Sequence, residues 1–321
     1  KLYKEILEKE PNHFGSNFYL GSLSLQNKNF EEAIQWYEKA IKINSNYPDT
    51  FNNLGTIYQN LKKYQNAIIY YEKAIKVNPN YPDAFNNLGT IKQIFGNLKE
   101  AIDHYEKAIK NNPNFSSAYS NLASVLNEIG EPKKAIENCE KAIKIDPQYA
   151  SAYSNLGNAY KKLKDYNKAI DCFEKVLQIN PKYVNAINNL GAIFRDLGKP
   201  KEAKKYFQKL NNKSSRGELL ECVYFSEGLN NYSKILKDFT NNDPLNLRVA
   251  TIAAYVSKKE NIENIYPFCK EPLNFIFTKN IKNELTSADK FLESLLNKIN
   301  KISAIWEPNS YTTKGGYQSI G

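Results

Sequence analysis

The stretch YPDTFNNLGTIYQNLKKYQNAIIYYEKAIKVNPN, Tyr47–Asn80, spans 34 residues, and the chain then starts the same pattern again from Tyr81 with YPDAFNNLG. Each copy holds two segments with apolar residues at helical spacing, separated by a short polar break. Patterns that return at a fixed interval of about 20 to 50 residues are typical of proteins built from stacked repeats. The interval therefore predicts a repeat protein rather than a single globular core.

Columns of one residue type follow this interval through six copies. The alanine column is Ala33, Ala67, Ala101, Ala135, Ala169 and Ala203, and the leucine column is Leu20, Leu54, Leu88, Leu122, Leu156 and Leu190. A small residue follows each leucine, at Gly21, Gly55, Gly89, Ala123, Gly157 and Gly191. An aromatic residue or a cysteine follows each alanine by four positions, at Tyr37, Tyr71, Tyr105, Cys139, Phe173 and Phe207. Proline closes the middle four copies, at Pro79, Pro113, Pro147 and Pro181.

Each copy is predicted to form two helices. The first, as in Pro82–Gly96, ends at a glycine that can serve as a C-cap, and the second follows in Leu98–Pro113. Small residues after the leucine and in the alanine column allow the paired helices to approach closely. Because one pair cannot bury its apolar stripe, we expect the pairs to stack into an all-α solenoid.

These columns resemble the tetratricopeptide repeat (TPR), with six full units over residues 14–213. Residues 1–13 fit the second helix of a truncated repeat, with Tyr3, Ile6 and Pro11 in the aromatic, alanine and proline columns, and this start indicates a segment of a longer protein. The resemblance implies a right-handed superhelical solenoid whose inner wall is lined by the first helices. In this family that wall binds extended peptides or partner helices, so we expect a protein–protein interaction scaffold.

An asparagine precedes the leucine in five of the six units, at Asn53, Asn87, Asn121, Asn155 and Asn189. Tyr19 takes this position in the first unit. An amide side chain carries two donors and an acceptor, so a file of amides could pair with the backbone of an extended peptide whatever its side chains. The alternative is that each asparagine bonds a neighbouring helix and binds no ligand.

The units SAYSNLASVLNEIG (Ser117–Gly130) and SAYSNLGNAY (Ser151–Tyr160) are similar to repeats of O-linked N-acetylglucosamine transferases, which carry an asparagine ladder. That resemblance implies peptide binding that tolerates many side chains, not glycosyl transfer.

Other positions expected on the inner wall are small or neutral in the central units: Thr56, Thr90, Ser124, Gln59, Gln93 and Asn127. TPR domains that clamp a terminal carboxylate use lysine or arginine in adjacent units, which these central units lack. Towards the C-terminal end the same positions hold Asn158, Lys161 and Arg195, and the two cations could favour an acidic partner there.

The repeat columns lapse beyond residue 213. Residues 214–260 are predicted to form degenerate or capping helices, and residues 261–321 a connector followed by the start of a possible catalytic domain. Trp306, Pro308 and the Gly315–Gly316 pair indicate a β-type segment at the end of the chain.

Together with YPFCKEPLNFI (Tyr266–Ile276), this ending resembles the lead-in of TPR-linked 2-oxoglutarate- and iron(II)-dependent oxygenases. The alternative function is therefore the substrate-recruiting part of such an oxygenase. Its iron site needs a His-x-Asp motif and a later histidine, which this stretch lacks, so no catalytic residue and no metal ligand is assigned. Fe(II) and 2-oxoglutarate would belong to a downstream domain, and a simple tail on a complete scaffold is the other interpretation.

Composition narrows the class of protein. The longest apolar run is about eight residues, well below a membrane span, and the net charge of +10 comes from 41 lysines and three arginines among 44 basic residues. Lysines mixed with glutamates indicate a solvated outer face, so neither a nucleic-acid nor a membrane partner is expected. Four separate cysteines and two histidines offer no metal cluster, and they suit a reducing, cytoplasmic compartment.

Overall fold

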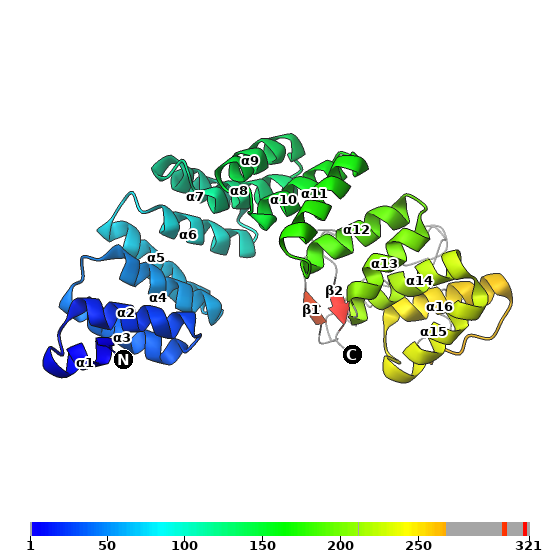
Figure 1. Cartoon of the computed structure of the whole chain (residues 1–321), viewed down its shortest axis with the longest axis horizontal. Coiled ribbons are helices and arrows are strands. Elements are labelled where there is room, and N and C mark those ends of the chain that lie inside the picture. Colours follow the sequence, from blue (N-terminus) through cyan, green and yellow to red (C-terminus); the bar gives the residue numbers. More distant parts are fainter. Residues whose placement is uncertain (1, 211, 268–303, 307–316, 320–321) are drawn as a thin grey trace, which may run out of the picture. The chain divides into compact units, whose positions relative to one another are not determined.

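The computed structural model describes residues 2–210, 212–267, 304–306 and 317–319 (Figure 1). These residues form sixteen α-helices, one short 3-10 helix and two short strands. The chain divides into two compact units, residues 1–180 and 181–321, and each is described here by itself. The all-helical repeat architecture predicted from the columns is confirmed.

The first unit is a stack of helix pairs. A short helix α1 (Leu2–Lys9) packs on α2, and its assignment to the second helix of a truncated repeat stays a prediction. Five complete pairs follow: α2 (Phe14–Gln26) and α3 (Phe30–Ile43), α4 (Pro48–Asn60) and α5 (Tyr64–Val77), α6 (Pro82–Ile94) and α7 (Leu98–Asn111), α8 (Ser116–Glu128) and α9 (Pro132–Ile145), and α10 (Ala150–Lys162) and α11 (Tyr166–Ile179). We number these pairs repeats 1 to 5. Each first helix also packs on the second helix of the preceding repeat, which makes a solenoid of the stack.

The second unit begins with repeat 6, formed by α12 (Val184–Asp196) and α13 (Pro200–Leu210). A 3-10 turn η1 (Lys213–Ser215) then leads into α14 (Arg216–Glu227), α15 (Leu229–Asn242) and α16 (Leu247–Glu260). Helix α14 packs against α13, α15 and α16. The assignment of residues 214–260 as degenerate or capping helices stays a prediction.

Two short strands lie in the stretch predicted to be of β type. Strands β1 (Ala304–Trp306) and β2 (Tyr317–Ser319) pair antiparallel, with Ala304 opposite Ser319 and Trp306 opposite Tyr317. The rest of the segment that resembles an oxygenase lead-in lies mostly outside the described residues, so that expectation stays a prediction.

Close packing inside each repeat depends on the small residue after the leucine. A Cβ atom added to Gly55 would lie 2.5 Å from the Tyr71 ring, and one added to Gly157 would lie 2.9 Å from the Phe173 ring. Real Cβ atoms do not approach a ring so closely, so glycine is needed wherever the partner is aromatic. Repeat 4 is the exception, since Ala123 occurs there together with the smaller Cys139.

The turn between the two helices of a repeat places one residue at positive φ. Glycine takes this position in three repeats, at Gly96, Gly130 and Gly198, as predicted for a C-cap. In the other three repeats the position is held by lysine, at Lys28, Lys62 and Lys164. The turn geometry is therefore imposed by the helix packing even where the residue type opposes it.

Candidate functional site

The asparagine column occupies equivalent positions on successive first helices. In the first unit Asn53 lies on α4, Asn87 on α6, Asn121 on α8 and Asn155 on α10, and all four side chains are partly exposed. Asn189, on α12 of the second unit, is also partly exposed and already has an interaction partner. The column is thus accessible to solvent even though it lies one residue from the buried leucine column.

Hydrogen bonds tie these asparagines to the first helix of the preceding repeat. Asn87 Nδ2 donates to Asn52 Oδ1 at 3.0 Å, and Asn121 Nδ2 donates to Asn86 Oδ1 at 3.0 Å. Asn155 Nδ2 donates to the carbonyl oxygen of Ser120 at 2.9 Å. The acceptors form a second column, buried and one residue before the asparagines, so each bond crosses the interface between repeats.

The bonds use the donor side of the amides and leave the acceptor side unused. Within the described residues, the Oδ1 atoms of Asn53, Asn87 and Asn121 accept no hydrogen bond. The asparagines therefore have a structural role between repeats, as the alternative interpretation of the sequence expected. That role leaves the partly exposed acceptors available.

The sequence analysis did not identify the acceptor column, Asn52, Asn86 and Ser120. The Asn–Asn doublet in FNNLG was the available signal, because two adjacent amides on successive helices can pair with each other across the repeat. Its meaning depends on how the first helices are offset when they stack, which the sequence alone does not state.

In the first three repeats, buried tyrosines of the second helices form hydrogen bonds to polar side chains of the first helices. Tyr37, Tyr71 and Tyr105 are fully buried, and their hydroxyl groups reach the polar residues expected on the inner wall. The Tyr71 hydroxyl donates to Gln59 Oε1 at 2.7 Å, and the Tyr105 hydroxyl donates to Gln93 Oε1 at 3.2 Å. Burial raises the pKa of Tyr71 to about 12 from its ordinary 10.0, so the hydroxyl stays a donor at neutral pH.

Tyr37 links two neighbouring repeats. Its hydroxyl donates to Ser22 Oγ at 3.0 Å and accepts from Asn53 Nδ2 at 3.0 Å. Ser22 belongs to the same repeat as Tyr37, whereas Asn53 lies on the first helix of the next. Tyr37 therefore contacts the asparagine column at Asn53.

Repeat 4 has no such hydroxyl, because Cys139 takes the tyrosine position. The Asn127 side chain turns instead to repeat 5, where Nδ2 donates to the carbonyl oxygen of Asn155 at 2.9 Å. Lys162 Nζ donates to the carbonyl oxygen of Asn127 at 2.6 Å, which adds a second bond across this interface. Asn127 is 5% exposed, so it belongs to the packing between repeats rather than to an accessible wall.

The two cations predicted near one end of the wall fall in different units. Lys161 lies in the last turn of α10 in the first unit and already has an interaction partner. Arg195 lies on α12 in the second unit, and its Nη2 is 3.1 Å from Asp196 Oδ1. The preference for an acidic partner stays a prediction, and part of the Arg195 charge is neutralised by its neighbour.

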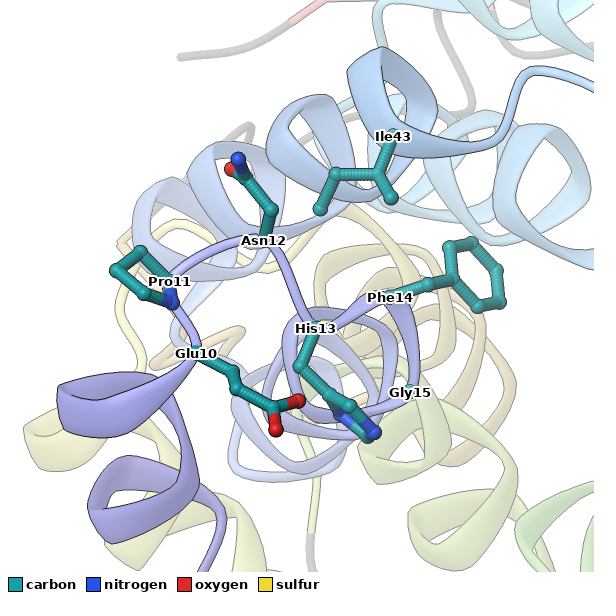
Figure 2. A pocket seen from close by; sticks show the side chains of 7 residues that line it. All are labelled: Glu10, Pro11, Asn12, His13, Phe14, Gly15 and Ile43. Carbon is teal, nitrogen blue, oxygen red and sulfur yellow. The ribbon is translucent and has the colours of Figure 1, made fainter.

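Two small pockets lie at turns between repeats. The first, about 550 Å³, is lined by residues 10–15 and by Ile43, which lies across from the turn in Figure 2. His13 caps α2 there, with its Nδ1 accepting from the Ser16 backbone N–H at 3.1 Å. The second pocket, about 510 Å³, repeats the arrangement around Pro113 and Ile145. Neither pocket is lined by an asparagine of the column.

Potential metal ligands and cysteines occur in the described part of the chain. Within residues 2–210, 212–267 and the two strands, no group of three or more His, Cys, Asp and Glu residues is placed to hold a metal ion. Cys139, Cys172 and Cys222 are buried free thiols, and burial raises their pKa values. Over the same residues, no helix is both long enough and apolar enough to cross a membrane.

Solved structures similar to this chain are helical repeat proteins. The Cut9–Hcn1 hetero-tetramer structure of the APC/C aligns with a TM-score of 0.61 at 17% identity, over 73% of this chain and 44% of that chain. PilW, a type IV pilus biogenesis factor, aligns with a TM-score of 0.59 at 18% identity, over 64% of this chain and 97% of that one. PilF of Pseudomonas aeruginosa gives a TM-score of 0.55 at 19% identity, over 70% and 97%. At these identities the likeness concerns the fold alone.

Three models of the tetratricopeptide repeat match the chain at successive, overlapping positions. The matches cover residues 48–81, 82–115 and 150–183 with one model, 21–62 and 123–164 with the second, and 2–35, 104–137 and 172–205 with the third. Together they extend from residue 2 to residue 205 of the 321. The sequence columns, the helix pairs and the stacking of these pairs agree with the matches, so the chain belongs to the tetratricopeptide repeat family.

Proposed function

We propose that this protein is an interaction scaffold that binds an extended peptide segment of a partner protein along the asparagine column of its first unit. The observation that carries the proposal is the file of partly exposed acceptors, Asn53, Asn87 and Asn121, whose donor groups are already used between repeats. Each bond holds its amide in one orientation, with Oδ1 left over.

An extended peptide is the occupant that suits this arrangement. Its backbone N–H groups must find acceptors when they leave water, and an unpaired buried group costs about 1–3 kcal/mol. A file of identical acceptors spaced by a repeated unit offers such partners without regard to the peptide's side chains. Because the asparagines would contact only the peptide backbone, we expect many different peptide sequences to bind, each with modest affinity.

The test uses the whole 321-residue chain and a defined probe. Random twelve-residue peptides displayed on phage are selected on the protein, and the strongest is synthesised with a fluorescent label. Twelve extended residues span about 40 Å, enough to pass several first helices. Affinity is measured by fluorescence anisotropy for the wild type and for N53A/N87A/N121A.

We expect the triple variant to bind at least tenfold more weakly, because each lost hydrogen bond contributes about 0.5–1.5 kcal/mol. The comparison variant is N52A/N86A, which keeps the exposed Oδ1 atoms but removes the buried acceptors that orient Asn87 and Asn121, so we expect a smaller loss of affinity. Both variants should lose stability, and only the first should lose most of its affinity. A folded triple variant with wild-type affinity, or a selection that yields no peptide, would overturn the proposal.

A further inference from the structure

The Gln59 side chain on α4 offers a hydrogen-bond donor, whereas the asparagine column offers acceptors. Its Oε1 accepts from the buried Tyr71 hydroxyl at 2.7 Å. With the oxygen held from behind, the Nε2 end of the amide is turned away from the tyrosine. Within the described residues that Nε2 makes no hydrogen bond, and the side chain is partly exposed.

Gln59 and Asn52, the hydrogen-bond partner of Asn87, lie on the same first helix, α4. In repeat 1 the Tyr37 hydroxyl bridges Ser22 of its own repeat and Asn53 of the next. Tyr71 is the equivalent residue of repeat 2, and its hydroxyl lies 3.4 Å from Thr56 Oγ1, the counterpart of Ser22. Asn87, the counterpart of Asn53, instead donates to Asn52 Oδ1 at 3.0 Å, and Asn52 lies on α4, the helix that also carries Gln59.

We propose that Gln59 is a further peptide-contacting residue that donates a hydrogen bond to a backbone carbonyl of the partner, and that Tyr71 is its positioning residue. The inference rests on the proposed function of the asparagine column. Asn87 offers an acceptor and Gln59 offers a donor, which together match the N–H and C=O groups that alternate along an extended backbone.

The neighbouring repeats show that this donor is particular to repeat 2. Gln93 is held by Tyr105 in the same way, but its Nε2 lies 3.3 Å from Ser124 Oγ and 3.4 Å from Glu128 Oε2. In repeat 4 the Asn127 side-chain amide already donates to the backbone carbonyl oxygen of Asn155. Among these three positions, Gln59 is the one whose donor is left for a ligand.

The experiment uses the selected twelve-residue peptide in two forms. Besides the normal peptide, a series is made in which one backbone amide at a time is exchanged for an ester, whose carbonyl is a poorer acceptor. Affinities are measured for the wild type and for Q59E, Q59L and Y71F. The control is Y64F, which removes a hydroxyl from the same helix α5 at a residue that packs edge-on against Phe95.

We expect Q59E and Q59L to bind the normal peptide about fivefold more weakly, since both lack the Nε2 donor. Y71F should lose about twofold to threefold, and Y64F should match the wild type. At one ester position the penalty seen with the wild type should largely disappear in Q59E and shrink in Y71F. A general loss of stability would not produce such a position-specific effect.

The outcomes separate this inference from the proposed function. If Q59E and Q59L bind like the wild type while N53A/N87A/N121A loses its affinity, the asparagine file stands and the role of Gln59 is overturned. Equal ester penalties at every position in the wild type and Q59E would overturn it as well. If the asparagine variant also binds normally, the proposed function itself fails.

Discussion

At the scale of single residues, Asn53 and Gly55 of FNNLG have different roles. Gly55 lies under the Tyr71 ring, where any Cβ atom would be too close, so it is required for packing. Asn53, two residues earlier, is partly exposed and bonds the Tyr37 hydroxyl. Residues such as Gly55 allow the two helices of a repeat to pack, whereas Asn53 places a hydrogen-bonding amide on the surface of the repeat.

The requirement for glycine leads to a prediction for G55A. The added methyl group would meet the Tyr71 ring at 2.5 Å, and overpacking of this kind costs about 1–3 kcal/mol. Alanine has the higher helix propensity, so it would stabilise α4 if space were free. We expect a lower midpoint of urea unfolding for G55A, and an unchanged or higher midpoint would contradict the packing argument.

Repeat 4 supplies the matched control for this substitution. C139Y should destabilise the protein because the ring would meet the Ala123 side chain, and A123G should recover much of the loss in the double variant. The coupling energy from the double-mutant cycle is the quantity to measure. Additive effects would show that residues 123 and 139 do not share one space.

At the scale of helices and turns, the sequence predicts the pairs well because the period of the apolar residues reports directly which face each helix buries. The predicted stretches Pro82–Gly96 and Leu98–Pro113 contain α6 (Pro82–Ile94) and α7 (Leu98–Asn111). Glycine marks three of the turns, but lysine occupies the same left-handed position in three others. No local rule selects lysine there, so those turns follow from the packing of the two helices.

The lysine turns lead to a stability prediction. Lys62 has φ of 57°, a conformation that costs a residue with a side chain about 1–2 kcal/mol. K62G should remove this strain at the expense of a more flexible unfolded chain, for a net gain of about 0.5–1 kcal/mol. Chemical denaturation provides the measurement, and K62A, which keeps a Cβ atom at the same positive φ, provides a control that should not stabilise.

The candidate site was only partly predictable at this scale. The asparagine column and its exposure follow from the repeat register, so Asn53 to Asn155 could be named from sequence. The direction of each amide could not, because it depends on Asn52, Asn86 and Ser120 on the neighbouring helix. Lys161 and Arg195 were grouped by register, yet they lie in separate units, and Arg195 contacts Asp196.

At the scale of the whole molecule, three tyrosine hydroxyls are buried in the first unit. Burial raises the pKa of Tyr71 and of Tyr105 to about 12 from 10.0, and it also raises the pKa of Tyr37. Because these folded-state values lie above the unfolded value, the contribution of the tyrosines is complete below pH 10. It is lost as the pH rises from 10 towards 12, where only the unfolded state releases the protons.

The expected alkaline loss is a few kcal/mol, since each unit of pKa shift corresponds to about 1.4 kcal/mol per group. Thermal unfolding between pH 8 and pH 11.5 measures it as a falling midpoint. The variant Y71F/Y105F, which lacks two of the hydroxyls, should be less stable at pH 8 and should lose less between pH 10 and 11.5. An equally steep fall in the variant would assign the effect to other groups.

The central claim is that the asparagine column contacts the backbone of an extended peptide, and the structure of the complex with the selected twelve-residue peptide tests it most directly. We expect an extended peptide whose backbone N–H groups lie within about 2.7–3.2 Å of Oδ1 in at least two of Asn53, Asn87 and Asn121. The existing bonds from Asn87 to Asn52 and from Asn121 to Asn86 should remain in place. A peptide bound to another surface, or one that leaves these oxygen atoms without a contact, would contradict the claim.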